Sequence, residues 1–237
     1  MCTVTFIPQP KGYILTSNRD ESALRSPQEI STELRNDQQL IFPRDKAAGG
    51  TWICLSSKDR LVCLLNGAFE RHQRRLPYRK SRGIMVFEFF DFPHATDFFA
   101  QYDFDNIEPF TMIIYDTGQL FDFRWDGEQT HLQTLDTQTQ YIWSSATLYE
   151  KPIQAKRKQW LAEWLDGRTD FSRTAILELH KKGGEGNPSI DFMMNRYNYL
   201  VQTVSITQVE LQDQAYRMYY HDLITNNKRE EGVEIDK

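Results

Sequence analysis

The second residue of the sequence is a cysteine, and its position gives it a chemistry that internal cysteines lack. The initiator methionine is usually removed when the next residue is small, so we expect Cys2 to become the first residue of the mature chain. It then carries both a thiol and a free α-amine. Ordinary pKa values are about 8.5 for the thiol and about 7.7–8.0 for the amine, so near neutral pH the amine can act as base and the thiol as nucleophile. These residue properties predict an N-terminal nucleophile.

Such a nucleophile needs neighbours that orient the amine, favour the thiolate and receive the oxyanion of a tetrahedral intermediate. The segment Ser17–Glu21 follows the second of two short predicted strands, so a hairpin would bring it close to the beginning of the chain. Within it, Asp20 is a candidate acceptor for the α-amine, and Arg19 is a candidate either to lower the thiol pKa or to hold a substrate carboxylate. Asn66 ends a predicted buried strand and is placed like an oxyanion donor. Each residue alone is also typical of a solvated turn.

The elements that must position these groups are mostly strands. Runs of β-branched and aromatic residues between turn residues predict strands at Thr3–Ile7, Tyr13–Thr16, Thr51–Leu55, Leu61–Asn66, Phe110–Tyr115, Leu120–Trp125, His131–Leu135, Tyr141–Trp143, Tyr199–Leu211 and Gln214–Tyr220. Apolar spacing and capping residues predict helices at Gly83–Phe90, Ala95–Tyr102, Pro152–Leu165 and Ser172–Lys181. The four strands between residues 110 and 143 are expected to form an antiparallel meander. This order predicts an antiparallel sandwich covered by helices.

The composition is that of an ordinary globular protein. The chain has 237 residues, 40% hydrophobic and 26% charged, which predicts one domain over residues 1–224 and a polar, flexible tail over 225–237. A formal net charge of −5 argues against a nucleic-acid partner. No apolar run reaches the roughly 18 residues of a membrane span, and no signal peptide is evident, so we expect a cytoplasmic protein.

The remaining candidate ligands predict no metal or other cofactor. The histidines lack metal-ligand spacing. Cys54 and Cys63 fall inside predicted strands and are expected to be buried free thiols, because an odd number of cysteines at low density is not a disulfide framework.

Five motifs, in this order and spacing, resemble the NRDE family, also called the transport and Golgi organisation 2 family. They are MCTVTFIP, SNRDES, AGGTWI at Ala48–Ile53, CLLNGAF at Cys63–Phe69 and SRG at Ser81–Gly83. The family is distantly similar to N-terminal-nucleophile (Ntn) hydrolases such as penicillin V acylase and bile-salt hydrolase. The resemblance therefore implies an α+β fold, a four-layer αββα sandwich of antiparallel sheets.

The resemblance also assigns roles by position. Cys2 matches the nucleophile, Arg19 and Asp20 resemble the Arg and Asp that flank it, and Asn66 resembles an oxyanion-hole asparagine. Those hydrolases separate their Arg and Asp by two residues, whereas the two are adjacent here. Ser145 stands where many family members have Asn, and Arg196 is the candidate for a late Arg of the hydrolases.

Four more residues are expected to bind substrate: Asn18, Glu21, Trp52 and Arg82. Trp52 is alternatively a core residue. Arg82 ends a basic cluster, Arg71–Arg82, that could bind a phosphate or carboxylate, for instance of an acyl-CoA or a haem propionate. The alternative for this cluster is a solvated loop.

Two functions follow. The first is an Ntn-type amidohydrolase that cleaves a carbon–nitrogen amide bond of a small-molecule substrate through Cys2. The second is a non-catalytic lipid, acyl-CoA or haem carrier that uses the same cleft, because eukaryotic relatives are associated with Golgi organisation, lipid metabolism and haem trafficking. The carrier predicts ligand binding that survives Cys2→Ser, and loss of that binding would count against its simplest form.

Overall fold

Two antiparallel β-sheets form the centre of the protein. The computed structural model describes residues 3–25 and 29–236. The first sheet has the strand order β10-β1-β2-β12-β13-β14, with β11 paired to β12, and the second runs from β3 to β9 in sequence order. The strands of the first sheet are β1 (Thr3–Gln9), β2 (Gly12–Glu21), β10 (Tyr141–Ser144), β11 (Asn195–Arg196), β12 (Val201–Gln212), β13 (Ala215–Asp222) and β14 (Lys228–Glu234). Those of the second are β3 (Ile30–Arg35), β4 (Gln38–Pro43), β5 (Ile53–Ser56), β6 (Arg60–Asn66), β7 (Phe110–Asp116), β8 (Gln119–Trp125) and β9 (Thr130–Leu135).

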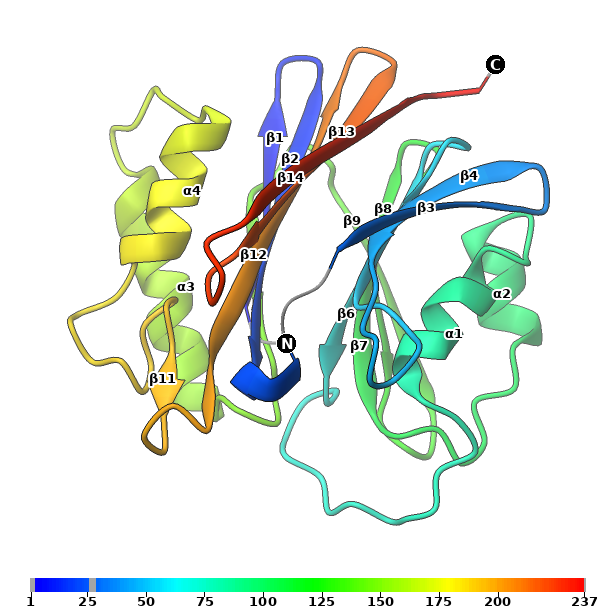
Figure 1. The fold of residues 1–237 in the computed structure, drawn as a ribbon, viewed down its shortest axis with the longest axis horizontal. Helices are drawn as coiled ribbons and strands as arrows, with labels where there is room; N and C mark the ends of the chain where they lie inside the picture. Colours follow the sequence, from blue (N-terminus) through cyan, green and yellow to red (C-terminus); the bar gives the residue numbers. More distant parts are fainter. Residues whose placement is uncertain (1–2, 26–28, 237) are drawn as a thin grey trace.

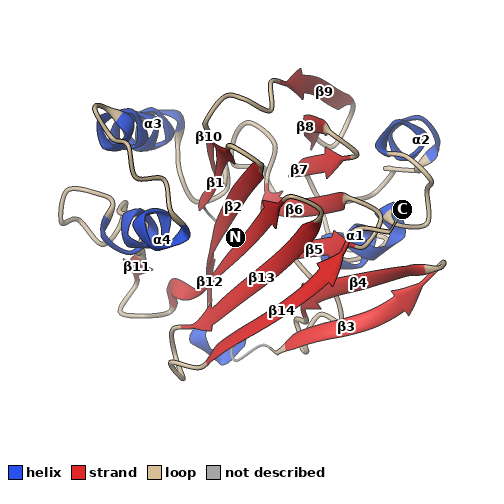
Figure 2. Cartoon of the chain, turned by 90° about the horizontal axis from the view of Figure 1, so that it is seen from above, coloured by secondary structure: helices blue, strands red, loops and turns tan. Residues whose placement is uncertain are grey.

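Helices cover the outer face of each sheet. The helices α3 (Lys151–Leu165) and α4 (Arg173–Lys182) lie on the first sheet, and α1 (Arg82–Phe89) and α2 (Ala95–Gln101) lie on the second (Figures 1 and 2). A short 3₁₀ turn, η1 (Ala23–Arg25), follows β2. This arrangement confirms the predicted αββα sandwich.

Side chains along β1 alternate between two cores. Val4 and Phe6 face the second sheet and belong to the main hydrophobic cluster. The Thr5 hydroxyl instead lies 2.7 Å from Nε2 of His180 in α4, and Ile7 packs in the smaller cluster beneath α3 and α4. This period of two follows from the pleat of a strand, and it decides which residues can reach each side of the first sheet.

The predicted helices are confirmed, with boundaries that follow their capping residues. The Ser172 side chain accepts a hydrogen bond from the Ala175 backbone N–H at the beginning of α4, and Gly183 follows its last residue. Pro152 lies in the first turn of α3, where a missing N–H costs nothing.

Two expectations about the strands are corrected, and one hairpin was missed. Tyr141–Trp143 does not extend the meander of β7, β8 and β9, because it forms β10 and pairs with β1 of the other sheet. Lys228–Glu234 is not a flexible tail, because it pairs along its length with β13. Its many charges are typical of an edge strand that must avoid pairing with other chains. The hairpin Ile30–Pro43 was not predicted, and it supplies β3 and β4.

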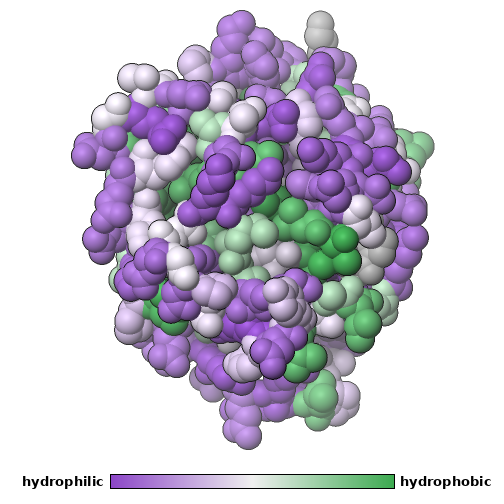
Figure 3. All heavy atoms as spheres, turned by 60° about the vertical axis from the view of Figure 1, so that its left-hand side comes forward, coloured by the Kyte–Doolittle hydropathy of each residue, from purple (hydrophilic) through white to green (hydrophobic). Residues whose placement is uncertain are grey.

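The outer surface is mainly polar. On the face shown in Figure 3, hydrophilic residues surround a smaller central group of hydrophobic ones. The most exposed large hydrophobic side chains, Leu24, Leu34 and Leu76, come from separate segments. Within the described ranges, every helix is too short or too polar to cross a bilayer.

Two glycines allow α1 to begin directly against the chain that enters β5. The Thr51 backbone N–H donates to the Gly83 carbonyl at 3.1 Å. A Cβ atom at Gly50 would lie 2.4 Å from the carbonyl carbon of Gly83, so only glycine fits without a backbone shift. Of the two glycines in the AGGTWI motif, Gly50 is therefore the one that this crossing requires.

We expect Gly50→Ala to lower the free energy of unfolding by more than about 2 kcal/mol, because the backbone of α1 must move to admit a methyl group. Gly118→Ala is the matched control: nothing lies within 4 Å of its Cβ position and its φ is +86°. Backbone strain alone should cost the control about 1 kcal/mol. Urea unfolding of both variants measures the difference, and equal losses would contradict the crossing.

Candidate active site

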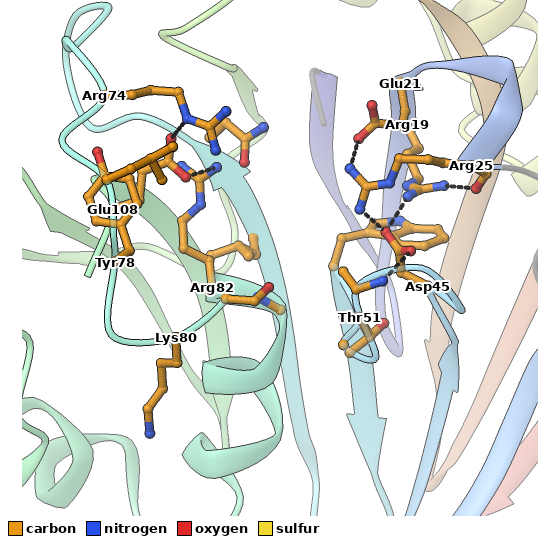
Figure 4. A pocket seen from close by; sticks show the side chains of 18 of the residues that line it. Arg19, Glu21, Arg25, Asp45, Thr51, Arg74, Tyr78, Lys80, Arg82 and Glu108 are labelled. Carbon is orange, nitrogen blue, oxygen red and sulfur yellow. Dashed lines mark hydrogen bonds and ion pairs between the residues drawn. The ribbon is translucent and has the colours of Figure 1, made fainter. Parts of the chain in front are cut away.

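A cavity of about 540 Å³ lies where the ends of β2 and β6 meet the beginning of α1. Charged side chains face each other across it in two groups (Figure 4). One group consists of Arg19, Glu21, Arg25 and Asp45, and the other of Arg74, Arg82 and Glu108. The cavity is thus a polar cleft rather than an apolar tunnel.

Arg19 is the central cation of the cavity wall and is 3% exposed. Its guanidinium lies over the Trp52 ring, 4.2 Å from the ring centroid, and donates to Asp45 Oδ2 at 2.7 Å. Burial lowers the Arg19 pKa from its ordinary value, while the charge of Asp45 opposes that change. Trp52 lines the cavity, and its buried indole N–H has no acceptor within the described residues.

Asp45 holds this wall together, and the sequence analysis missed it. Its Oδ2 also accepts from Arg25, and its Oδ1 accepts from the backbone N–H groups of Ala47 and Ala48, each at 3.1 Å. An aspartate followed by small residues and glycine is a signal for such a side-chain-to-backbone turn. That signal could have identified the turn, though not the arginine from β2 that it pairs with.

Glu21 also lines the cavity, where its Oε2 pairs with Arg25 Nη1 at 2.5 Å. Glu21 therefore positions Arg25, and its carboxylate is already paired within the protein.

Asp20 faces the opposite side of the sheet from Arg19, because neighbouring strand residues alternate. It is 3% exposed, and its carboxylate accepts from the Thr203 hydroxyl at 2.6 Å and from the Tyr149 hydroxyl at 3.0 Å. The Tyr149 ring lies between two guanidinium groups, at 3.6 Å from Arg157 and 5.0 Å from Arg196. Arg196 thus contacts the support of Asp20 and does not line the cavity.

Asn18 is a structural residue and not the substrate ligand that was expected. It is fully buried on the helix-facing side of β2 and is absent from the cavity lining. Its amide nitrogen donates to the carbonyls of His180 and Phe192 at 3.1 and 2.8 Å, and its Oδ1 lies 2.8 Å from His180 Nδ1. These bonds attach α4 to the first sheet.

Asn66 lines the cavity at the end of β6, as expected. Its backbone carbonyl accepts from the hydroxyl of Ser145, which also lies 3.0 Å from the Thr147 hydroxyl. Its side-chain amide has no hydrogen bond within the described part of the chain, and so it can donate to a ligand. Ser145 acts by positioning the Asn66 backbone.

Arg82 lines the cavity and is held in place from two sides. Its Nη1 donates to the Pro109 carbonyl at 2.7 Å, and its Nη2 pairs with Glu108 at 3.0 Å. Burial lowers its pKa from the ordinary value, although Glu108 favours the charged form. Arg82 is therefore a preorganised cation beside the cleft.

Cys2 lies outside the described residues. The described chain begins at Thr3, which pairs with Asn18 of β2 and with Ser144 of β10.

The two internal cysteines are buried, as expected, and burial raises the pKa of both thiols, to about 12 for Cys63. Neither is a nucleophile near neutral pH. Among residues 3–25 and 29–236, no cluster of three or more His, Cys, Asp or Glu side chains is placed to hold a metal ion.

The sequence model of the Transport and Golgi organisation 2 family matches residues 1–231. The chain belongs to this family. A search of curated protein sequences found no significant match.

Solved structures place this family member among Ntn-hydrolase-like folds. The C2A mutant of the conjugated bile acid hydrolase from Clostridium perfringens superposes with a TM-score of 0.58 at 11% identity, covering 99% of this chain and 92% of that one. The Caenorhabditis elegans ortholog of N-acylethanolamine-hydrolyzing acid amidase superposes with a TM-score of 0.54 at 14% identity, covering 87% and 92%. At these identities the likeness is one of fold.

The buried His180 predicts a pH dependence of stability. Burial, with the nearby charge of Arg157, lowers its pKa to about 3, whereas an unfolded histidine has a pKa of about 6.5. Between these values the unfolded chain binds more protons, so stability is lost as the pH falls, by roughly 1 kcal/mol per pH unit. Urea unfolding between about pH 7 and pH 5 should show this slope in the wild type and a smaller one in His180→Gln. His94→Gln, at an exposed position, is the control, and equal slopes in wild type and His180→Gln would contradict the assignment.

Removing the Asp45 charge should be costly, because it leaves Arg19 buried without its countercharge. We expect Asp45→Asn to lower the free energy of unfolding by about 3 kcal/mol or more. Asp213→Asn removes the carboxylate from an exposed pair with Lys11 and should cost at most about 1 kcal/mol. Chemical denaturation compares them, and a loss at Asp45 no larger than the control would show that the pair is not needed.

Proposed function

We propose that this protein is an Ntn-type amidohydrolase that cleaves a carbon–nitrogen amide bond through Cys2 after removal of Met1. The observation that carries this proposal is the register of β1 on β2. Thr3 lies opposite Asn18, and both face the helices, whereas Val4 and Arg19 face the space between the sheets. The described part of β1 therefore begins beside the end of β2 that carries Arg19, at the cavity.

In the proposed reaction the Cys2 thiolate attacks the amide carbonyl carbon, and the α-amine takes the thiol proton. The tetrahedral intermediate collapses, the amine passes the proton to the leaving nitrogen, and a thioester remains on Cys2. Water then attacks the thioester, giving the carboxylic acid and the free thiol. Atoms balance as amide plus water to acid plus amine.

The surrounding groups support these steps. The buried cation of Arg19 favours the thiolate over the thiol. Asp20, at the end of β2, is held by Tyr149 and Thr203 and orients the α-amine. The free Asn66 amide is the proposed oxyanion donor. Trp52 and Arg82 contribute the cavity wall that contacts the substrate.

The structural neighbours support a substrate class that is consistent with this proposal. One is a conjugated bile acid hydrolase with its second residue changed from Cys to Ala, and the other is an N-acylethanolamine-hydrolyzing acid amidase ortholog. Both are named as hydrolases, which supports a small-molecule amide as the substrate class here. Binding of haem or an acyl-CoA, and with it the carrier function, remains a prediction from the sequence.

The test begins with the intact mass, which should correspond to a chain without Met1. Release of free amine from a panel of N-acyl amides should then fall about a thousandfold or more in kcat/KM for Cys2→Ala. A non-cleavable N-terminal extension, which removes the free amine and keeps the thiol, should also abolish activity. Iodoacetamide applied to the folded protein should modify Cys2 alone, because Cys54 and Cys63 are buried.

A Cys2→Ala protein that keeps its amidase activity would refute the proposal, as would an active enzyme that retains Met1. Binding of acyl-CoA or haem that persists in Cys2→Ser, without amide hydrolysis by the wild type, would instead support the carrier.

A further inference from the structure

A second cavity adjoins the first and is rich in arginine. It has a volume of about 610 Å³ and shares part of its wall with the first cavity, including Asn66 and Arg82. Its charged lining consists of Arg25, Arg71, His72, Arg74, Arg82 and a single carboxylate, Glu108. The whole chain carries a net charge of −5, so this concentration of cations is local and opposite in sign to the rest of the molecule.

One carboxylate serves three basic side chains in this second cavity. Glu108 lies 3.0 Å from Arg82, 3.2 Å from Arg74 and 3.2 Å from His72. Arg71 has no ion pair within the described residues. The Glu108 charge is thus shared, and the cavity keeps an excess of N–H donors arranged for an oxyanion.

We propose that this second cavity binds a carboxylate or phosphate group carried by the substrate, with Arg71 and Arg74 as its principal ligands. The assignment of that anion to a substrate rests on the proposed function, whereas the anion site itself can be tested by binding alone. Asn66 lines both cavities, so a ligand can place its amide beside Asn66 and its anion in the arginine-rich cavity.

The site combines a fixed cation on α1 with arginines from the irregular segment that precedes this helix. Arg82 is at the first position of α1, and the Pro109 carbonyl and Glu108 hold its guanidinium. Arg74 pairs with the same Glu108 while its side chain remains 66% exposed, so it can turn toward an entering anion. A fixed cation beside an adaptable one favours recognition at low entropic cost.

Other basic residues of the same segment provide controls. Arg75 is exposed and lines neither cavity, although it adjoins Arg74 in sequence. Arg79 pairs with Asp103 at 2.7 Å and also lines neither cavity. A general electrostatic attraction would depend on all of these arginines, whereas a site depends on those that line the cavity.

The test measures binding to the full chain carrying Cys2→Ala, so that turnover plays no part. Isothermal titration compares N-dodecanoylglycine with its neutral carboxamide, and the phosphate monoester of N-dodecanoylethanolamine with the parent alcohol. At least one anionic member should bind about tenfold or more tightly than its neutral partner, and the pair that shows it identifies the oxyanion. Arg71→Gln/Arg74→Gln should remove that preference, and Arg75→Gln/Arg79→Gln should retain it.

Equal binding of both members of each pair would overturn the proposal, and so would a preference that survives in Arg71→Gln/Arg74→Gln or disappears in the control double variant. Thermal unfolding of both double variants checks that they are folded. This binding result does not depend on the proposed reaction. An anion preference without Cys2-dependent hydrolysis would support the anion site and refute the proposed amidohydrolase. Cys2-dependent hydrolysis of neutral amides without an anion preference would support the amidohydrolase and refute the anion site.

Discussion

The alternation of side chains along β2 is the constraint on which the site depends. Asn18, Arg19 and Asp20 are consecutive, yet they serve different layers of the sandwich because successive strand residues point to opposite faces. Asn18 binds α4 through His180, Arg19 faces the cleft, and Asp20 meets Tyr149 from the helix side. A shift of β2 by one residue in its pairing with β12 would exchange these roles. The long pairing of β2 with β12 therefore secures the site as well as the sheet.

Two buried arginines lie on opposite sides of this sheet and are stabilised differently. Arg19 has a carboxylate partner in Asp45. Arg157 is fully buried and donates to neutral acceptors, the Thr3 hydroxyl and the carbonyls of Ile190 and Asp191, with no ion pair within the described residues. Burial of a charge is costly unless hydrogen bonds satisfy it. Burial is the main cause of the lowered His180 pKa, and the nearby charge of Arg157 lowers it further.

The sequence predicted local features well and distant pairings poorly. The hairpin of β1 and β2 and the capped helix α4 follow from turn residues and caps that are close in the chain, so both were predictable. Asp45 was missed because its partner, Arg19, lies 26 residues earlier, and β10 was assigned to the wrong sheet because strand patterns do not name their partners. Asn18 was misassigned because its motif suggests a shared role for consecutive residues, whereas the strand separates them.

The acidic composition argues against a nucleic-acid partner, but it does not describe the cleft. In physiological salt, exposed charges act over about 8 Å, so carboxylates spread over the exterior do little to cancel a group of arginines gathered in one cavity. Within the cleft Arg19 and Arg82 are largely desolvated, so their charges act more strongly than they would in water. The proposed preference for an anion rests on Arg74 and Arg82, which only the folding of the segment after β6 against Glu108 brings together.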